Sequence, residues 1–186
     1  SDTPAWIVAC CNTIAELRGW TSFCGLQIEY SLVNRDAERD LIPMARSFGL
    51  PITPWSPLGA GVLSGKYIDA HPAGGVRLKP DSVRLSERNM QIAKEVAAVA
   101  SELGVSSAQV ALAWIRRVLP NAVPILGART IEQLHDNLGC LHVALSDDHL
   151  ARLDNISKIV RGWPHDFLAG ENIQNLMFAY SQNKIR

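Results

Sequence analysis

The chain has 186 residues, 47% of them hydrophobic and 19% charged, which predicts a single domain over residues 1–186 with a sizeable core. Because 18 Lys and Arg residues balance 18 Asp and Glu residues, the overall charge favours neither nucleic acid nor a membrane surface as a partner. The four cysteines form no C-x-x-C pair, which argues against a zinc site and a disulfide framework. With no long apolar run and no leader pattern, we expect a cytoplasmic protein.

The first predicted elements are a strand, a helix and a second strand. Residues 26–32 alternate apolar and polar side chains, as a half-buried strand does. Residues 37–49 carry apolar side chains at helical spacing and stop at Gly49, although Pro43 interrupts the pattern. Residues 50–57 return as a strand, and their prolines argue against the middle of an antiparallel ladder.

A long loop and two helices follow. Residues 68–85 contain His71-Pro72, Gly74-Gly75 and Lys79-Pro80, and they predict a loop of the length that often covers a binding site. A helix then runs from Ser86 to Leu103 and ends at Gly104. Ser106 and Gln109 have the spacing of a capping box at the start of a helix over residues 107–119.

The last predicted elements are a strand and two helices. The short apolar run 122–128 predicts a buried strand, and Thr130 with Gln133 forms another capping-box pattern directly after it. Ser146 caps a helix that continues to about Ile156, and the tail from Lys158 onward has no clear period.

Strands that alternate with helices predict an α/β fold in which crossover helices join parallel strands. A closed barrel and an open doubly wound sheet both fit this order. In either fold, ligands bind at the carboxyl ends of the strands.

The stretch 54-PWSPLGAGVLSGKY-67 resembles a phosphate-binding loop. A Walker loop would need glycine at Ala60 and a hydroxyl residue at Tyr67, and a G-x-G-x-x-G fingerprint would need glycine at Ser64, so both motifs fail. What remains is a strand followed by a glycine-rich turn whose amides could face an anion, with Lys66 close in sequence. A flexible turn with a surface lysine explains the same residues.

A second anion site is predicted in 127-GARTIEQLHDN-137. Arg129 follows the end of the predicted strand, and Thr130 caps a helix whose first amides are electropositive. A guanidinium can bind a phosphate through two hydrogen bonds. An ordinary capped helix beside a solvent-facing arginine is the alternative, but two such sites in one α/β chain suit a dinucleotide with separate pyrophosphate and ribose phosphate groups.

Trp55 offers a flat surface on which a nicotinamide or flavin ring could stack, although aromatic side chains more often belong to the core.

The candidates for catalysis are few. The five histidines lack metal-ligand spacing, no G-x-S-x-G elbow occurs, and Asp36, Asp147 and Asp148 stand at helix starts, where capping explains them. The residues predict a binding site without a metal and without an obvious acid, base or nucleophile.

The blocks 26-LQIEYSLVNR-35, 49-GLPITPWSPLGAGVLSGKY-67 and 124-PILGARTIEQLHDNLG-139 resemble the aldo-keto reductase family, in family order and spacing. The resemblance covers nearly the whole chain. It implies a (β/α)8 TIM barrel that binds NADPH in extended form and reduces aldehydes and ketones by hydride transfer.

The resemblance also implies a role for each segment along the cofactor NADP(H). The N-terminal pair and the glutamine would hold the carboxamide, the tryptophan would stack on the nicotinamide, and the following turn would line the pyrophosphate. The second segment would face the adenosine phosphate, adenine and ribose, and the positive charge of its arginine favours NADPH over NADH. In that order, the residues are Ser1, Asp2, Gln27, Trp55, Ser56, Pro57, Leu58, Gly59, Ala60, Lys66, Gly127, Arg129, Gln133, Asp136 and Asn137.

The family's catalytic tetrad of Asp, Tyr, Lys and His lies on the first four barrel strands, whereas this sequence is expected to begin at the end of the fifth. Tyr30 and Tyr67 belong to the cofactor blocks and do not match the tetrad tyrosine. We therefore expect a partial barrel of about strands 6–8 with the surrounding helices: the C-terminal half, present as a fragment, a truncated product or an engineered piece.

The predicted function is the NADP(H)-binding part of an aldo-keto reductase that has no reductase turnover by itself and needs its other half to accept a small carbonyl substrate. The alternative is a non-catalytic half-barrel that binds a second copy or an N-terminal partner, because exposed strand edges must be covered. A third possibility is a different enzyme that uses residues the sequence does not single out.

Overall fold

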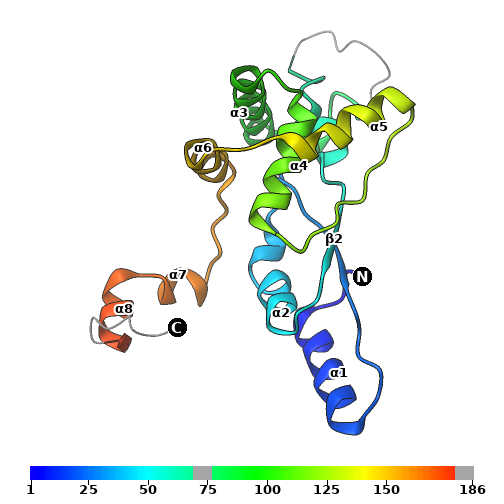
Figure 1. The fold of residues 1–186 in the computed structure, drawn as a ribbon. Coiled ribbons are helices and arrows are strands. Elements are labelled where there is room, and N and C mark those ends of the chain that lie inside the picture. Colours follow the sequence, from blue (N-terminus) through cyan, green and yellow to red (C-terminus); the bar gives the residue numbers. More distant parts are fainter. Residues whose placement is uncertain (69–76, 179–186) are drawn as a thin grey trace.

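The computed structural model describes residues 1–68 and 77–178, so residues 69–76 of the predicted loop lie outside the described part. Two parallel strands pair with each other, and helices form most of the other regular structure, as Figure 1 shows. The predicted α/β class is confirmed. The strands are β1 (Leu26–Glu29) and β2 (Ile52–Trp55), and the helices are α1 (Ala5–Arg18), α2 (Leu41–Ser47), α3 (Glu87–Leu103), α4 (Ser107–Val118), α5 (Ile131–Leu138), α6 (Asp147–Ser157), α7 (His165–Leu168) and α8 (Glu171–Phe178).

Both strands form where the sequence predicts them, but each is shorter than its predicted range. They pair in parallel from Leu26 beside Ile52 to Glu29 beside Trp55. β1 ends early because the next residues turn: the amides and carbonyls of Ser31 and Asn34 bond to each other at 3.0 and 3.1 Å.

The prediction of a buried strand over residues 122–128 is wrong. The segment runs beside β2, since the amides of Val123 and Ile125 donate to the carbonyls of Ile52 (2.9 Å) and Pro54 (2.8 Å). No strand among the described residues pairs with its other edge, and Val123 and Ile125 are 65% and 42% exposed. With one neighbour only, the segment stays extended but does not become a buried strand.

The helix predicted over residues 37–49 is broken in two. A short 3₁₀ turn covers Asp36–Glu38, and α2 begins only at Leu41. Pro43 lies in the first turn of α2, where its missing N–H needs no partner. Gly49 follows the helix with a positive φ of 62°, the left-handed conformation that glycine adopts without strain.

The predicted caps at Ser106, Thr130 and Ser146 are confirmed, and Ser86 is a further cap, but the boxes predicted with Gln109 and Gln133 form only their hydroxyl half. Four side-chain hydroxyls each accept a hydrogen bond from the backbone amide three residues later, which satisfies one of the unpaired donors at the helix start. Gly104 ends α3 in the left-handed conformation, as predicted. The cap pairs are Ser86 with Asn89, Ser106 with Gln109, Thr130 with Gln133, and Ser146 with His149.

The helices α1, α7 and α8 were not predicted. α1 buries Ala5, Val8, Asn12 and Ala15, which share one face of the helix. The tail that has no clear period in the sequence forms α7 and α8, and both lie apart from the other helices at the end of an extended connection (Figure 1).

The core lies between the strand pair and the helices α2, α3, α4 and α6. Leu26 and Ile28 of β1 and Ile52 of β2 belong to one cluster with buried residues of these helices. Trp114 of α4 is fully buried, and its ring stacks on that of Tyr30 with centroids 5.5 Å apart.

Arg35, which follows β1, joins four segments of the chain. Its guanidinium donates to Glu38 (2.6 Å), to Asp154 (2.9 Å) and to the hydroxyl of Ser157 (2.8 Å), and it lies 5.0 Å from the ring centroid of Trp114. The two carboxylates come from the turn before α2 and from α6. A single planar side chain therefore fixes α4 and α6 against the end of β1.

Burial and charge together shift the titrations in this cluster. Burial, followed by the negative charge of Glu38, raises the pKa of Tyr30 well above its ordinary value of 10.0, and the Tyr30 hydroxyl donates to Glu38 at 2.7 Å. Burial, the largest single effect, works to lower the pKa of Arg35, but hydrogen bonding to Glu38 and the nearby negative charges together outweigh burial and raise that pKa. At neutral pH, the Tyr30 phenol therefore stays neutral and the Arg35 guanidinium stays charged.

Within the described residues, no single helix is both long and apolar enough to cross a membrane. α3 and α4 meet that test only as a pair, and the chain bends by 98° between them.

We predict that Arg35→Ala lowers the free energy of unfolding by about 3 kcal/mol, because it leaves the largely buried Glu38 carboxylate without its main cation. Urea unfolding followed by circular dichroism measures the change. Lys94→Ala, at an exposed position of α3, is the control and should change the stability by less than about 0.5 kcal/mol. Equal unfolding midpoints for the two variants would show that the Arg35 cluster does not stabilise the fold.

Candidate functional site

The candidate site lies on the face of the sheet opposite the core. Leu26 and Ile28 point into the core, so Gln27 and Glu29 occupy the other face of β1. The strand register places Gln27 beside Thr53 and Glu29 beside Trp55. On the far side of β2, Ala122 pairs with Ile52, so the exposed Val123 lies in the row of Gln27 and Thr53.

The predicted N-terminal pair lies next to this face. The amide of Asp2 donates to the carbonyl of Gln27 at 3.3 Å, and the Asp2 carboxylate accepts a hydrogen bond from the indole of Trp55 at 3.4 Å. Asp2 also accepts from the hydroxyl of Ser1 (3.0 Å). The structure therefore brings Ser1, Asp2, Gln27 and Trp55 together, although they are up to 54 positions apart in the sequence.

Directly after β2, the chain makes a tight glycine-rich turn. Ser56, Gly59, Ala60 and Gly61 all have positive φ values, which places the turn in a conformation that few residue types adopt without strain. A side chain at Gly59 would also lie 2.6 Å from a methyl of Val33. Both the backbone angle and the space require glycine at this position.

The amides of the turn are already used inside it. Gly59 and Gly61 donate to the carbonyls of Ser56 and Leu58 at 2.9 Å each, and Ala60 donates to the hydroxyl of Ser56 at 3.2 Å. Pro57 has no amide hydrogen. In this conformation, the amides of Gly59, Ala60 and Gly61 do not form the row of anion-binding donors that the sequence suggested.

One cation is held against the turn. The ammonium of Lys66 lies 3.0 Å from the point where a Cβ of Gly61 would be, and 5.1 Å from the ring centroid of Tyr67. The glycine makes room for the ammonium, and the aromatic ring offers a cation–π contact. The positive charge of Lys66 beside the turn favours an anion such as a phosphate group.

The second predicted anion site begins at the exposed residues Gly127 and Arg129. Thr130 caps α5, and Gln133 accepts a hydrogen bond from the amide of Arg129 at 2.9 Å instead of from Thr130, so the capping box is only half formed. Arg129 also takes part in a further contact. Arg129 thus directly precedes the N-cap of α5, and a helix N-terminus favours anions.

Asp136 and Asn137 lie on the part of α5 that faces α4. The Asp136 carboxylate accepts hydrogen bonds from the hydroxyl of Ser106 (2.8 Å) and the side-chain amide of Gln109 (3.0 Å). Asn137 is buried. A role of Asp136 and Asn137 in binding adenine or ribose remains a prediction, since both face protein in this structure.

Ser106 and Gln109, predicted from the sequence only as a helix cap, also contact α5, and Gly139 is a further residue of this contact. Gln109 also donates to the backbone carbonyl of Asp136 (2.9 Å), and a Cβ at Gly139 would overlap its side-chain nitrogen. On the other side of α4, a Cβ at Gly65 would lie 3.3 Å from the hydroxyl of Ser107. The first turn of α4 therefore contacts both predicted anion sites.

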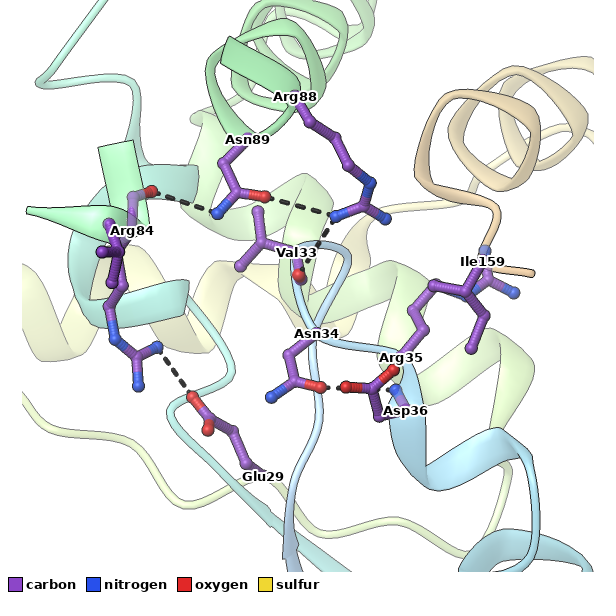
Figure 2. A pocket seen from close by; sticks show the side chains of 10 residues that line it. Glu29, Val33, Asn34, Arg35, Asp36, Arg84, Arg88, Asn89 and Ile159 are labelled. Atoms are coloured by element: carbon purple, nitrogen blue, oxygen red, sulfur yellow. Dashed lines mark hydrogen bonds and ion pairs between the residues drawn. The ribbon is translucent and has the colours of Figure 1, made fainter. Parts of the chain in front are cut away.

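A cavity of about 340 Å³ lies at the carboxyl end of β1, and Figure 2 shows its lining. Arg84 pairs with Glu29 at 2.7 Å, and Arg88 donates to the carbonyls of Val33 and Ser157 at 3.3 and 2.8 Å. None of the predicted cofactor residues lines it. Its charged groups are used to hold the loops around α3 together.

Among residues 1–68 and 77–178, no group of three or more His, Cys, Asp or Glu side chains is arranged to hold a metal ion.

Comparison with known proteins gives matches over most of the chain. The model of the aldo/keto reductase family matches residues 1–158. The probable aryl-alcohol dehydrogenase AAD4 of Saccharomyces cerevisiae is 34% identical over 175 residues, which cover 92% of this chain and 53% of that protein. Norsolorinic acid reductase stcV of Emericella nidulans is 35% identical over 169 residues, covering 90% of this chain and 42% of that protein.

A third relative carries its cofactor in its name. Aryl-alcohol dehydrogenase [NADP(+)] of Phanerodontia chrysosporium is 33% identical over 171 residues, covering 89% of this chain and 44% of that protein. The chain spans about half the length of the curated relatives that it matches. Because the family model matches well over half of its residues, the chain belongs to the aldo/keto reductase family.

Proposed function

We propose that residues 1–186 form one domain, the C-terminal half of a (β/α)8 barrel, and that this half binds NADP(H) for an enzyme that transfers hydride to aldehydes or ketones. The observation that carries the proposal is the contact between Asp2, Gln27 and Trp55 on the open face of the sheet. In a barrel, ligands bind at the carboxyl ends of the strands. Trp55 and the turn after it stand at that end of β2.

The residues present fit a nicotinamide dinucleotide from one end to the other. Trp55 would hold the nicotinamide ring, and Ser1, Asp2 and Gln27 would hold its carboxamide. The turn of residues 56–60, with Lys66, would hold the pyrophosphate. The cofactor supplies the hydride, while these residues bind and orient it.

The adenosine end would be held by the segment that precedes α5 and by the start of that helix. Gly127 leaves room for the ligand, since a Cβ there would have no atom within 4 Å. Arg129 supplies a cation that NADPH, with its additional phosphate, would use and NADH would not. Gln133, Asp136 and Asn137 complete the proposed set.

We further propose that these residues alone bind the cofactor without reducing a carbonyl. The family resemblance puts the catalytic tetrad on barrel strands that do not correspond to β1 or β2, and no residue of the described part is matched to the tetrad tyrosine. Without a general acid, the carbonyl oxygen would receive no proton. A cytoplasmic location and a small carbonyl substrate for the complete barrel belong to the same proposal.

We predict that the chain enhances NADPH fluorescence on binding and that Arg129→Ala lowers the NADPH affinity about tenfold, because a charge-assisted bidentate contact is lost. NADH affinity should stay unchanged in this variant, whereas Trp55→Leu should weaken both cofactors alike. Fluorescence titration measures all of these affinities, and added aldehyde should cause no loss of the NADPH signal.

The control is Arg18→Ala, an exposed arginine at the far end of α1, which should bind both cofactors as the unchanged chain does. Equal NADPH affinity for Arg129→Ala and Arg18→Ala would remove Arg129 from the phosphate site. NADPH consumption with aldehyde by the pure chain would contradict the proposed lack of turnover.

A second candidate function is a non-catalytic half-barrel that pairs with a second copy or with an N-terminal partner. The face with Gln27 and Val123 is open, although parallel sheets are normally covered on both faces. Apolar side chains of α5 and the turn after it are also exposed on one side of the helix: Ile131, Leu134, Leu138 and Leu141. Such a surface is typical of a contact with another chain.

If the open face is covered by a second copy, we predict a dimer in light scattering and a monomer for Val123→Arg, since a buried, unpaired charge destabilises an interface. Leu176→Arg is the control, because Leu176 is 79% exposed and belongs to α8, which lies apart from the strands (Figure 1). A monodisperse monomer of the unchanged chain would exclude pairing with itself. A dimer that survives Val123→Arg would place the contact elsewhere.

A further inference from the structure

The first turn of α4 links the two segments to which we assign the phosphates of the cofactor. Ser107 packs against Gly65 at the end of the glycine-rich turn, while Ser106 and Gln109 bond to Asp136 of α5. All three residues belong to the N-cap and first turn of α4. The position of α5 relative to the glycine-rich turn is therefore set through α4.

Gln109 forms two of the hydrogen bonds between α4 and α5. Its side-chain nitrogen donates to both the carboxylate (3.0 Å) and the backbone carbonyl (2.9 Å) of Asp136, so it fixes the rotation and the height of α5 at that residue. The nitrogen lies against the Cα of Gly139, where any Cβ would overlap it. The close approach depends on glycine at that position.

We infer that Gln109, Gly139 and Asp136 are positioning residues for cofactor selectivity: they hold α5 so that Arg129 and Gln133 meet the additional phosphate of NADPH. The inference rests on the proposed function. Asp136 lies one helical turn after Gln133, so fixing Asp136 also fixes the direction in which Gln133 and the start of α5 point.

The test compares NADPH with NADH in variants that disturb this contact from its two sides. Gln109→Leu removes the donor. Gly139→Ala keeps both polar side chains but pushes Gln109 away, and its backbone cost is small because Gly139 has the helical φ of −55°. Each variant should lower the NADPH affinity about tenfold, as expected for loss of hydrogen bonds to a charged group, and the NADH affinity by less than about threefold.

The double variant Gln109→Leu/Gly139→Ala should bind NADPH no more weakly than Gln109→Leu alone, because both changes act through one side chain. Gly25→Ala is the control: its backbone is not left-handed, its Cβ would make only ordinary contacts, and it should leave both affinities unchanged. Thermal unfolding identifies a temperature at which every variant is folded, so a general loss of stability cannot alter the ratio.

The outcomes separate the two proposals. An unchanged NADPH-to-NADH affinity ratio in Gln109→Leu and Gly139→Ala, or losses that add in the double variant, would overturn the positioning role while leaving cofactor binding in place. Failure of the unchanged chain to bind either cofactor would overturn the proposed function and this inference with it.

Discussion

The buried contact of Arg35 with Glu38, Asp154 and Trp114 is the constraint on which the rest of the structure depends. The guanidinium is planar and always charged, so it can meet two carboxylates and an aromatic ring at the same time. Glu38 precedes α2, Asp154 belongs to α6, and Trp114 belongs to α4. This single residue therefore ties the end of β1 to three helices, and α4 in turn contacts both halves of the candidate site.

The same arrangement leaves one face of the sheet open. The helices cover the side of Leu26 and Ile28, while Gln27 and Val123 are exposed on the other. Parallel sheets are normally covered on both faces, whereas this sheet is covered on one. Asp2 and Trp55 meet at its open face. Cofactor binding and association with another half-barrel would therefore use neighbouring parts of one surface.

Local sequence signals predicted the helices whose ends are set by a capping side chain or by a glycine. Ser86 and Gly104 delimit α3 because a side-chain cap and a left-handed glycine act within one turn of the helix. α1 was missed because Trp6 and Leu17 put large apolar side chains on its exposed side, so the pattern does not distinguish two faces. The run at 122–128 was predicted as a buried strand because hydrophobicity reports what a segment could bury, whereas burial needs neighbours on both edges.

The sequence by itself determined the family, the α/β class, the helix caps and the order of the candidate site segments, since each of these follows from residue type and local spacing. Only the tertiary structure decided that the amides of Gly59, Ala60 and Gly61 bond within their own turn, and that Asp136 bonds to Gln109. Asp136 and Gln109 are 27 residues apart. A hydrogen bond between two helices depends on how those helices pack, and local sequence patterns do not show which residues of two separate helices come into contact.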